Sequence, residues 1–438
     1  MTREDERKND STPCDNHGVG EKRALSRRTF LQNAAAFPCL LGASAHAANQ
    51  RKAKPVRKTK VAVIGAGAFG GWTALHLLKQ GAKVMLLDAW GAGNSRASSG
   101  GDTRVIRGAY GGDADYIEWV ARSFVLWQEA EARWRTKVYH RTGSLWMYAG
   151  DDRHARSSIE PLRKRGLEIQ HWSLSEAARR FPQLRFDGIQ SVYYEPEAGY
   201  LMARRSCELV RQSFVSEGGE FQQASVRPGR IEARMMREIN LEDGTSVRAD
   251  AFVFACGPWL GKIFPDVIGN LISPTRQEVY FFGAPAGDQR FNEEHLPIWV
   301  AFGKRVIYCL PGNERRGLKV CDDTRGEPFD PTDGDRTPTP ALIQIVREEL
   351  RVRLPDLAEA PLLEARVCQY EDTPDKNLII DRHPEAGNVW FVGGGSGHGF
   401  KFGPALGEHV AHLILGKQQP KARFQLFRSG LINKGDSF

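Results

Sequence analysis

A glycine-rich segment has the residue types and the spacing of a dinucleotide-binding turn. The sequence GAGAFG at residues 65–70 has its glycines at Gly65, Gly67 and Gly70. Glycines at this spacing let the chain turn tightly and approach a pyrophosphate, whose charge lies at the amino end of the following helix. Asp88 lies 18 residues beyond Gly70 and is placed to accept hydrogen bonds from a ribose. An acid here argues against a 2′-phosphate, so the segment predicts FAD or NAD rather than NADP.

The elements expected around this turn form a strand–helix–strand unit. Residues 61–64 (VAVI) are an unbroken apolar run, which is typical of a parallel strand buried on both faces. A helical stretch follows and ends near Gly81, and residues 84–87 (VMLL) predict a second strand that ends at Asp88. The glycine pattern is weak in isolation but strong in this context.

Later segments have the character of strands that return to the same sheet. Residues 248–257 (RADAFVFACG) and 388–395 (NVWFVGGG) are apolar runs that end in glycine. An NAD-dependent enzyme usually completes its cofactor domain in one continuous block, whereas here such strands recur near both ends of the chain. This interleaving favours FAD. It predicts an α/β fold in which a Rossmann-like FAD domain of the glutathione-reductase type alternates with a substrate domain built on an antiparallel sheet.

The same pattern predicts the domain organisation. The substrate domain is expected at 141–194 and 271–364, which are rich in aromatic residues, proline and alternating patterns. The FAD domain is expected at 60–140, 195–270 and 365–438. The sequence shows no internal repeats.

Two further blocks of residues are difficult to explain as scaffold. The first is GDTRVIR at 101–107. The second begins with CQY at 368–370 and continues through TPD at 373–375 to SGHGFKF at 396–402. Together with the first motif, this order resembles the monomeric sarcosine oxidase and N-methyltryptophan oxidase group of the D-amino-acid-oxidase-like flavoproteins. The resemblance covers essentially the whole chain beyond the leader.

The resemblance implies a set of flavin contacts. Members of the group hold FAD covalently through a cysteine sulfur on the flavin 8α carbon, and Cys368 stands at that place; a buried, inert cysteine is the alternative. Arg104, which is also expected to act in catalysis, corresponds to an arginine near the flavin ring, and Val226 to a residue whose backbone meets the adenine. The other cofactor contacts expected, besides the first three glycines and Asp88, are Thr103, Gly395, Ser396, Gly397, Gly399 and Lys401.

The resemblance also implies a catalytic set. Lys319 aligns with a lysine over the flavin that promotes reaction with oxygen, since an ammonium in a dry site stabilises developing negative charge. Tyr308 and Tyr370 are expected to wall the substrate pocket. Arg107 and Lys401 correspond to a pair that grips the substrate carboxylate through charge-assisted hydrogen bonds. For each cation the alternative is a structural ion pair or a solvated surface position.

Three positions depart from the sarcosine oxidase pattern. Asp323 stands where those enzymes have a histidine, four residues beyond the lysine, and Ser99 and Gly100 replace two histidines before the GDTR block. The substrate is therefore expected to differ in shape or in the pKa of its amine. His398 is expected to belong to a tight turn whose backbone meets the flavin rather than to act as a base.

Composition limits the other classes of partner. The chain has 438 residues, 41% hydrophobic and 26% charged, which is too apolar for disorder and long enough for about two domains. The net charge of +8 owes much to a basic run at 51–60, and no basic helix follows, so nucleic acid is not expected. No apolar run is long enough to span a membrane. The cysteines beyond residue 47 have no metal-like spacing, so neither a zinc site nor a disulfide framework is expected.

Residues 1–47 have the features of an export signal. Paired arginines at 27–28 precede a short apolar stretch at 34–41 and two A-x-A cleavage patterns. They predict a twin-arginine signal, with an ordinary secretion signal or a basic tail as alternatives, followed by a basic linker at 48–59. Twin-arginine export carries folded proteins, which suits a protein that must acquire its cofactor first. A periplasmic or extracellular location and the export machinery as a partner are therefore expected.

The sequence thus predicts a FAD-dependent oxidoreductase that acts on a CH–NH group. The expected substrate is a secondary or cyclic amino acid, which would be oxidised to an imine while O₂ is reduced to H₂O₂. The alternatives are an exported flavin dehydrogenase that passes electrons to a quinone or a carrier, a NAD-dependent reductase, and a non-catalytic binding protein with a flavin fold.

Overall fold

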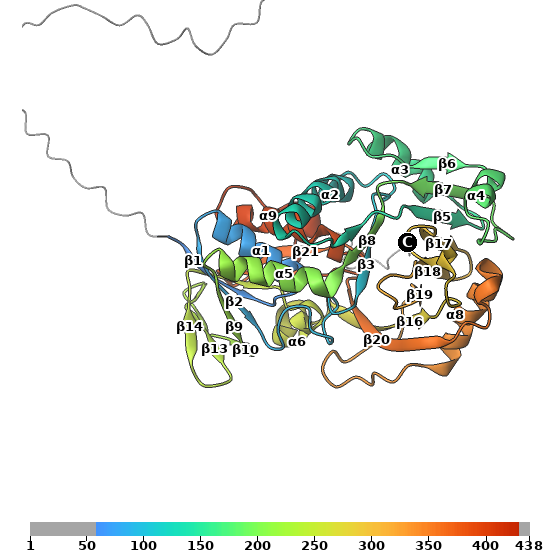
Figure 1. Cartoon of the computed structure of the whole chain (residues 1–438). Helices are drawn as coiled ribbons and strands as arrows, with labels where there is room; N and C mark the ends of the chain where they lie inside the picture. Colours follow the sequence, from blue (N-terminus) through green and yellow to red (C-terminus); the bar gives the residue numbers. More distant parts are fainter. Residues whose placement is uncertain (1–57, 429–438) are drawn as a thin grey trace, which may run out of the picture. The chain divides into compact units, whose positions relative to one another are not determined.

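The described part of the protein, residues 58–428 of a computed structural model, contains two large sheets (Figure 1). In that view the parallel sheet and its helices lie on the left and the larger sheet on the right. The predicted export signal and the linker up to residue 57 lie outside the described residues. Within residues 58–428 no helix has the length and apolar character needed to cross a membrane.

The first sheet has six strands, of which five run parallel and one edge strand runs antiparallel. Its order is β21 (Ile379–His383), β22 (Ala386–Gly393), β15 (Ala251–Phe254), β1 (Lys60–Ile64), β2 (Lys83–Asp88) and β9 (Glu220–Gln223). Strands from both ends of the chain therefore lie side by side. The predicted Rossmann-like sheet, with returning strands near 250 and 390, is confirmed.

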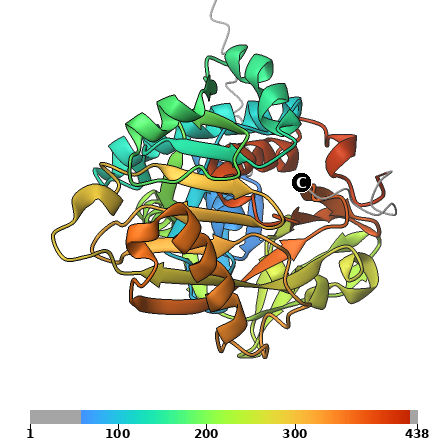
Figure 2. The same ribbon diagram turned by 90° about the vertical axis from the view of Figure 1, so that its right-hand side faces the viewer.

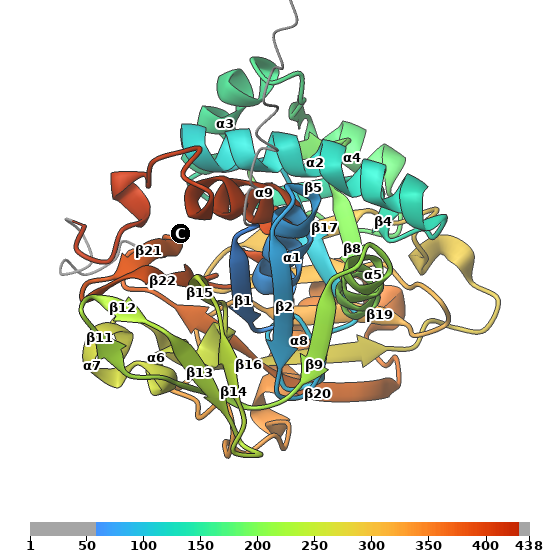
Figure 3. The same ribbon diagram turned by 90° about the vertical axis from the view of Figure 1, so that its left-hand side faces the viewer.

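Both faces of this sheet are covered, as the apolar run at 61–64 predicts. Val61 and Val63 pack toward a helical layer, while Ala62 and Ile64 pack toward the opposite face. The helices are α1 (Ala68–Lys79), α2 (Ala114–Trp134), α5 (Ala203–Ser216) and α9 (Gly403–Ile414), as Figure 3 shows. The opposite face carries a three-stranded sheet of β10 (Val226–Pro228), β13 (Glu238–Leu241) and β14 (Ser246–Arg248), with the short helices α6 (Leu260–Ile263) and α7 (Pro265–Ile268).

The second sheet has eight strands and is antiparallel except where β5 and β17 run parallel. Its order is β20 (Leu362–Asp372), β16 (Ser273–Phe282), β19 (Leu318–Asp322), β18 (Val306–Leu310), β17 (Ile298–Phe302), β5 (Ser144–Tyr148), β7 (Ser191–Glu195) and β6 (Gln170–Trp172). Helix α8 (Pro340–Arg353) packs its Val346 and Leu350 on one face of this sheet (Figure 2). The predicted sheet of the substrate domain is therefore present.

Strand β20 crosses the predicted domain boundary at 364/365. It pairs with β16 from Leu362 to Asp372, so Cys368 and Tyr370 lie in the eight-stranded sheet by hydrogen bonding. A three-stranded sheet of β3 (Thr103–Ile106), β8 (Gly199–Met202) and β4 (Tyr139–His140) carries the GDTR block. The remaining regular elements are α3 (Arg153–Arg163), α4 (Leu174–Arg180), β11 (Ile231–Glu232) and β12 (Met235–Met236).

Candidate active site

The glycines of the first motif hold α1 tightly against β1 and β15. Gly65 has a φ of +103°, which favours glycine, and a Cβ atom there would lie 2.3 Å from the carbonyl oxygen of Ala255. A Cβ atom at Gly70 would lie 1.9 Å from the carbonyl oxygen of Gly65. Neither position accepts a side chain unless the backbone moves, so the amino end of α1 stays close to the strand ends.

Asp88, at the end of β2, forms a hydrogen bond with the backbone of this turn. Its Oδ2 accepts the N–H of Ala66 at 2.7 Å, and its Oδ1 accepts the N–H of Trp90 at 2.9 Å. Burial raises the pKa of the Asp88 carboxyl, and these backbone bonds oppose the increase. Each carboxylate oxygen keeps a second lone pair, so Asp88 can also accept a hydrogen bond from a ligand hydroxyl.

A cavity of about 280 Å³ joins the first motif to the carboxyl-terminal blocks. The predicted cofactor residues that line it are Gly65, Gly67, Asp88, Arg104, Val226, Gly395, Gly397 and Gly399, and Tyr370 lines it too. The amino end of α1 offers backbone N–H groups and the positive end of a helix dipole to an anionic pyrophosphate. Oε2 of Glu371 is buried in the wall without a partner. The residues present therefore fit a bound dinucleotide.

Other predicted residues lie behind this lining. Gly70 packs against β1, as described above. Ser396 is 1% exposed; its hydroxyl accepts the N–H of Thr373 at 3.1 Å and donates to the carbonyl of Gly394 at 3.2 Å, so it holds its own turn together. Thr103 is also buried. Its carbonyl oxygen accepts hydrogen bonds from Lys319 and Arg104.

A second group of predicted residues lies on the inner face of the eight-stranded sheet. The strand neighbours of Tyr308 and Lys319 pack into the cluster under α8, so alternation directs these two side chains to the opposite face. Tyr308 and Cys321 are directly paired across β18 and β19. Burial raises the pKa of the Tyr308 hydroxyl far above its ordinary value, so Tyr308 is neutral.

Lys319 is an almost fully buried cation. It is 4% exposed, and its Nζ donates a hydrogen bond to the carbonyl oxygen of Thr103 at 2.9 Å. Burial lowers its pKa to about 8, and the nearby Arg104 acts in the same direction. Two N–H groups of the ammonium remain for other partners. A buried ammonium of this kind can stabilise negative charge that develops beside it.

Arg104 connects the sheet face to the cavity. Its Nη1 donates to the carbonyl oxygen of Thr103 at 2.8 Å, and its Nη2 donates to that of Ser98 at 2.5 Å. The same Nη2 lies 3.3 Å from Sγ of Cys368. The half-buried sulfur is therefore held beside a guanidinium that lines the cavity.

Arg107 is held between aromatic rings at the end of β3. Its Cζ lies 4.3 Å from the ring centroid of Tyr110 and 5.1 Å from that of Trp146. Its Nη1 donates to the carbonyl oxygen of Ala109. Glu195 is 2% exposed and accepts the backbone N–H groups of the two residues after Arg107 at 2.6 and 3.2 Å, which fixes this turn.

Lys401 begins a chain of hydrogen bonds. Its Nζ donates to the Tyr110 hydroxyl at 2.8 Å and to the carbonyl oxygen of His398 at 2.6 Å. The Tyr110 hydroxyl lies 3.3 Å from Nδ1 of His398, whose Nε2 lies 3.0 Å from the carbonyl oxygen of Lys376. A carbonyl only accepts hydrogen bonds, so Nε2 carries the ring proton and Nδ1 accepts from the tyrosine. One N–H of Lys401 remains for a ligand.

The titration of these groups follows from their burial. Burial lowers the pKa of His398 to about 3, and Lys401 adds to the decrease. His398 is therefore neutral and engaged at both nitrogens, which suits a positioning role. Burial also lowers the pKa of Lys401 well below its ordinary value, with Arg107 acting in the same direction and Asp323 against it.

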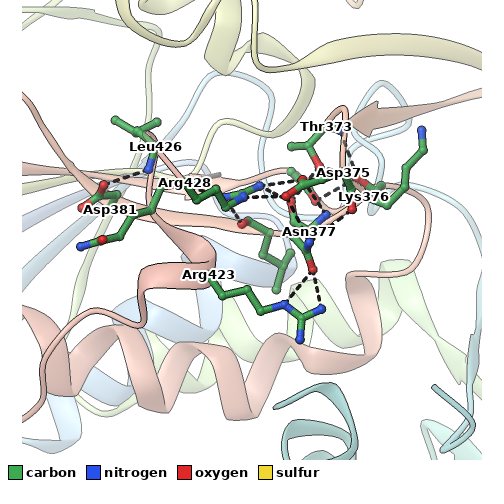
Figure 4. A network of polar contacts seen from close by, with 12 residues as sticks. Thr373, Asp375, Lys376, Asn377, Asp381, Arg423, Leu426 and Arg428 are labelled. Atoms are coloured by element: carbon green, nitrogen blue, oxygen red, sulfur yellow. Dashed lines mark hydrogen bonds and ion pairs between the residues drawn. The ribbon is translucent and has the colours of Figure 1, made fainter. Parts of the chain in front are cut away.

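The turn that carries the Lys376 carbonyl is fixed by the carboxyl-terminal segment (Figure 4). Arg428 forms a bidentate salt bridge with Asp375, with Nε–Oδ2 and Nη2–Oδ1 distances of 2.7 and 2.9 Å. Arg423 donates twice to Oδ1 of Asn377, at 3.1 and 2.7 Å. Lys376 lies between these two anchored residues, so its carbonyl oxygen has a defined position.

Asp323 follows β19 and lies close enough to Arg325, Arg107 and Lys401 to interact with them electrostatically. Its Oδ1 accepts the Tyr370 hydroxyl at 2.8 Å, and the nearest guanidinium nitrogen of Arg325 is 3.8 Å away. The side chain is 40% exposed, yet the surrounding protein raises its pKa through burial, against the effects of Arg325, Tyr370 and Arg107. The Asp323 carboxylate in turn opposes the decrease in the pKa of Lys401. The candidate site thus combines the cations Arg107 and Lys401 with one carboxylate.

The two positions where histidines are replaced have a structural explanation. Oγ of Ser99 accepts the N–H of Ala68 at 3.1 Å and so caps the first turn of α1. A Cβ atom at Gly100 would lie 1.9 Å from the carbonyl oxygen of Asn94. This loop therefore requires glycine at position 100.

Sequence reasoning did not identify four residues of the site. Tyr110 and Glu195 orient the two cations, Arg325 pairs with Asp323, and Glu371 lies in the cavity wall. Tyr110 comes only three residues after Arg107, which is the one local signal available. Within residues 58–428 no group of three or more His, Cys, Asp and Glu side chains is arranged to hold a metal ion.

Comparisons with known proteins agree with this geometry. Residues 60–413 match the family described as DAO, FAD dependent oxidoreductase. Monomeric sarcosine oxidase from Streptomyces avermitilis is 30% identical over 368 residues, which cover 81% of this chain and 93% of the relative. The monomeric sarcosine oxidase of a Bacillus species is 28% identical over 365 residues, with 81% and 92% covered.

A solved structure shows the same fold. L-proline dehydrogenase from P. horikoshii superposes with a TM-score of 0.73 at 21% identity, covering 83% of this chain and 94% of that one. The likeness confirms the predicted fold class, and the family match confirms the resemblance drawn from the motifs.

Proposed function

Because the chain belongs to the DAO family of FAD-dependent oxidoreductases, we propose that it oxidises the C–N bond of a secondary or cyclic amino acid and passes the electrons to O₂. The observation that carries this proposal is a grouping of three charged side chains. Arg107 and Lys401 both contact Tyr110, and Asp323 bonds to Tyr370 in the wall of the cavity that fits FAD. A zwitterionic amino acid has the complementary charges.

The substrate carboxylate binds to the two cations. Arg107 is held by its stacking on Tyr110 and Trp146, which leaves its guanidinium little freedom to turn away. Lys401 has one N–H free of protein partners. Charge-assisted bonds from both groups orient the amino acid and fix the position of its nitrogen.

Asp323 receives the proton of the substrate ammonium. Its raised pKa makes the ionised carboxylate a better base than an ordinary aspartate, and the Tyr370 hydroxyl stabilises the ionised form. The deprotonated amine is the form whose nitrogen lone pair assists oxidation of the neighbouring C–H bond. The role left open by the sequence, that of a base, thus falls to the residue that departs from the sarcosine oxidase pattern.

The residues that would hold FAD are the glycines of the first motif, Asp88, Val226 and the segment at 395–399. Bound FAD supplies the two-electron acceptor for the substrate and returns the electrons to oxygen. Lys319 stabilises the negative charge that oxygen acquires, and hydrogen peroxide leaves as the product.

Covalent attachment of the flavin to Cys368 is part of the proposal. The guanidinium of Arg104, which lines the cavity, lies 3.3 Å from the sulfur and so places Cys368 beside the cofactor site. Acid-precipitated protein is expected to stay yellow, and Cys368→Ala is expected to release its flavin. Cys321→Ala is the matched control, because Cys321 is a buried cysteine on β19 of the same sheet, separated from β20 by β16. A colourless parent pellet contradicts the attachment.

Export through the twin-arginine pathway is also proposed, on the paired arginines at 27–28 and the A-x-A patterns behind them. Replacement of both arginines by lysine is expected to keep the flavin-loaded protein in the cytoplasm, as measured by cell fractionation. An unchanged periplasmic fraction contradicts this route.

The test of the reaction is an anaerobic amine screen of the mature protein. Sarcosine, other N-methyl amino acids, L-proline and L-pipecolate are compared with the same amines lacking a carboxylate. The expected result is bleaching of the flavin by a carboxylate-bearing secondary amine and release of one peroxide per turnover in air. Bleaching without peroxide, with reduction of a quinone, indicates the dehydrogenase alternative. Failure of every amine indicates a non-catalytic protein.

A further inference from the structure

Glu371 is a buried acid of the cofactor cavity that the proposed reaction does not use. It follows Tyr370 on β20 and is 6% exposed. A Cβ atom at Gly257 or Gly393 would lie 3.6 Å from its Oε2, and one at Gly395 would lie 2.9 Å from its Oε1. The 3.6 Å distances are ordinary contacts, whereas a Cβ atom at Gly395 would be too close, so Gly395 leaves room for this carboxyl group.

The two oxygens of the carboxyl group have different surroundings. Oε1 accepts the N–H of Gly395 at 3.0 Å, whereas Oε2 is buried and has no hydrogen-bond partner. An unpaired buried polar atom costs about 1–3 kcal/mol, and more if it is charged. Within residues 58–428 no cationic side chain compensates Glu371. Oε2 therefore lacks the partner that its burial demands, and it lies at the wall of the cavity.

The surroundings favour the protonated carboxyl. Burial raises the pKa of Glu371 to about 7, in spite of the N–H groups of Gly394 and Gly395. Asp372, on the same strand, adds to the increase although it is paired with Arg325.

The other elements around Glu371 bring no positive charge to it. From the segment after β15 the titratable neighbour is Cys256, whose thiol pKa is raised by burial, with Asp88 and Glu371 adding to the effect. Helix α1 contributes the uncharged ring of Phe69 beside Gly395. The neutral acid is therefore the form that this environment stabilises.

We propose that Glu371 binds the cofactor as a protonated acid that donates a hydrogen bond from Oε2 to an oxygen acceptor of FAD. The pyrophosphate, the ribityl chain and the flavin carbonyls all offer such acceptors. An ionised carboxylate in this place would be repelled by the anionic dinucleotide and would have no proton to donate. The inference rests on FAD binding and is independent of the amine reaction.

This contact makes FAD affinity depend on pH. In the protein without FAD the group loses its proton near pH 7, and in the complex its pKa is higher because the bond holds the proton. The stabilisation is therefore fully present below about pH 7 and is lost as the pH rises through the pKa of the complex. Since FAD binding takes up one proton within that window, the Kd is expected to rise there by about tenfold per pH unit.

The test uses the full-length protein with Cys368→Ala, in which FAD is held without a covalent bond. Its Kd for FAD is measured from flavin fluorescence on dilution between pH 6 and pH 9. Glu371→Gln keeps a donor but cannot ionise, so its Kd is expected to equal the parent value at pH 6 and to lack the part of the rise that is due to Glu371. Lys319 has a pKa of about 8, so the difference between the parent and the Gln variant isolates Glu371.

Glu278→Gln is the matched control. Glu278 is also a buried glutamate, 5% exposed, but its oxygens are bonded to Tyr280, Thr339 and Arg276 away from the cavity. It is expected to leave the pH dependence unchanged. In the holoprotein, infrared difference spectra are expected to show the C=O stretch of a protonated carboxylic acid that Glu371→Gln removes.

Three results would overturn the proposal. One is a parent Kd that is constant or that falls as the pH rises, which would mean that an ionised Glu371 accepts from a ribityl hydroxyl or makes no contact. Another is a Gln variant that binds FAD as weakly as Glu371→Ala at pH 6. The third is an infrared spectrum that Glu371→Gln leaves unchanged, which decides the matter even if the Ala variant does not fold.

Discussion

The two walls of the site are built in different ways. The cofactor wall depends on backbone groups at the glycine turn, where the glycines are closely spaced and Asp88 accepts the N–H of Ala66 as well as that of Trp90. The proposed substrate wall, which comprises Arg107, Lys401 and Asp323 with the groups that hold them, is made of side chains that meet from distant parts of the chain. The bond between Lys401 and Tyr110, for example, joins residues 291 positions apart.

This difference determines how each wall can change. An added methyl group at Gly65 or Gly70 would collide with backbone, so this part of the cofactor wall is fixed by sterics. The substrate wall is fixed by charge and hydrogen bonding, so one exchanged side chain can alter the amine that fits. Asp323 is such an exchange, since its carboxylate replaces the histidine expected from the family resemblance.

The largest effect is expected from Gly70→Ala. The new Cβ atom would meet the carbonyl oxygen of Gly65 at 1.9 Å, and the resulting shift of α1 is expected to cost about 3 kcal/mol and to abolish FAD binding. Flavin content and Tm measure it. Gly81→Ala is the control, because Gly81 also has a positive φ but nothing within 4 Å of its Cβ position. It should lose about 1 kcal/mol and keep its flavin.

The same contrast explains how much the sequence predicts. The strand at 61–64, the turn at 65–70 and the acid at Asp88 are local features, and the structure contains each of them where it is expected. The returning strands β15 and β22 were also visible as apolar runs. Strand β20 was not assigned to its sheet, because its pairing with β16 joins segments about 90 residues apart and leaves no local pattern.

The substrate wall was accessible from the sequence only through the family resemblance. Arg107, Lys401 and Lys319 could be named, but not the groups that orient them. Tyr110 and Glu195 act through contacts that only the folded chain creates. No pattern in the sequence places a buried glutamate beside the turn after Arg107.

Lys319→Met is expected to separate the two half-reactions. It removes the buried ammonium, so the rate of flavin reoxidation by O₂ should fall about 10²–10³-fold while anaerobic bleaching is unchanged. In the parent, the oxygen reaction should slow as the pH rises through about 8, because the ammonium loses its proton there. Stopped-flow spectroscopy measures both steps. Equal slowing of both steps in the variant would contradict an oxygen-specific role.

Arg107→Lys tests whether the guanidinium binds the substrate carboxylate. The charge is kept, but the planar fork and its stacking on Tyr110 and Trp146 are lost. A loss of about 3 kcal/mol in kcat/KM is expected, mostly through KM, with normal flavin content. Arg122→Lys is the control, because Arg122 pairs with Glu408 on the surface. A substrate that lacks the carboxylate should be indifferent to both changes, and sensitivity of that substrate to Arg107→Lys would count against the assignment.

Asp323→Asn tests the proposed base. In the parent, kcat/KM should decrease as the pH falls below the raised pKa of Asp323, since only the ionised carboxylate accepts a proton. The variant should lose this acidic limb and about 2 kcal/mol in kcat/KM at its optimum. The pH profile is the measurement. An acidic limb that survives in the variant would assign the base to another group.

The smallest effect is expected from Tyr110→Phe. The change removes the hydroxyl that accepts from Lys401 and donates to His398, while the ring under Arg107 remains. Lys401 should become less well oriented. The KM for the substrate should rise about fivefold, which corresponds to about 1 kcal/mol, and kcat should change little.

Tyr116→Phe is the matched control for this last change. The Tyr116 ring lies 5.2 Å from that of Tyr110, and its hydroxyl accepts the backbone N–H of Leu378 rather than touching Lys401. Tyr116→Phe should lower Tm about as much as Tyr110→Phe does, because each change removes one hydrogen-bonded hydroxyl, and it should leave KM unchanged. If both variants change KM equally, the substrate wall depends on general packing, as the cofactor wall does, and the contrast between the two walls fails. If only Tyr110→Phe changes KM, the cations of the substrate wall are positioned by hydrogen bonds that span the chain.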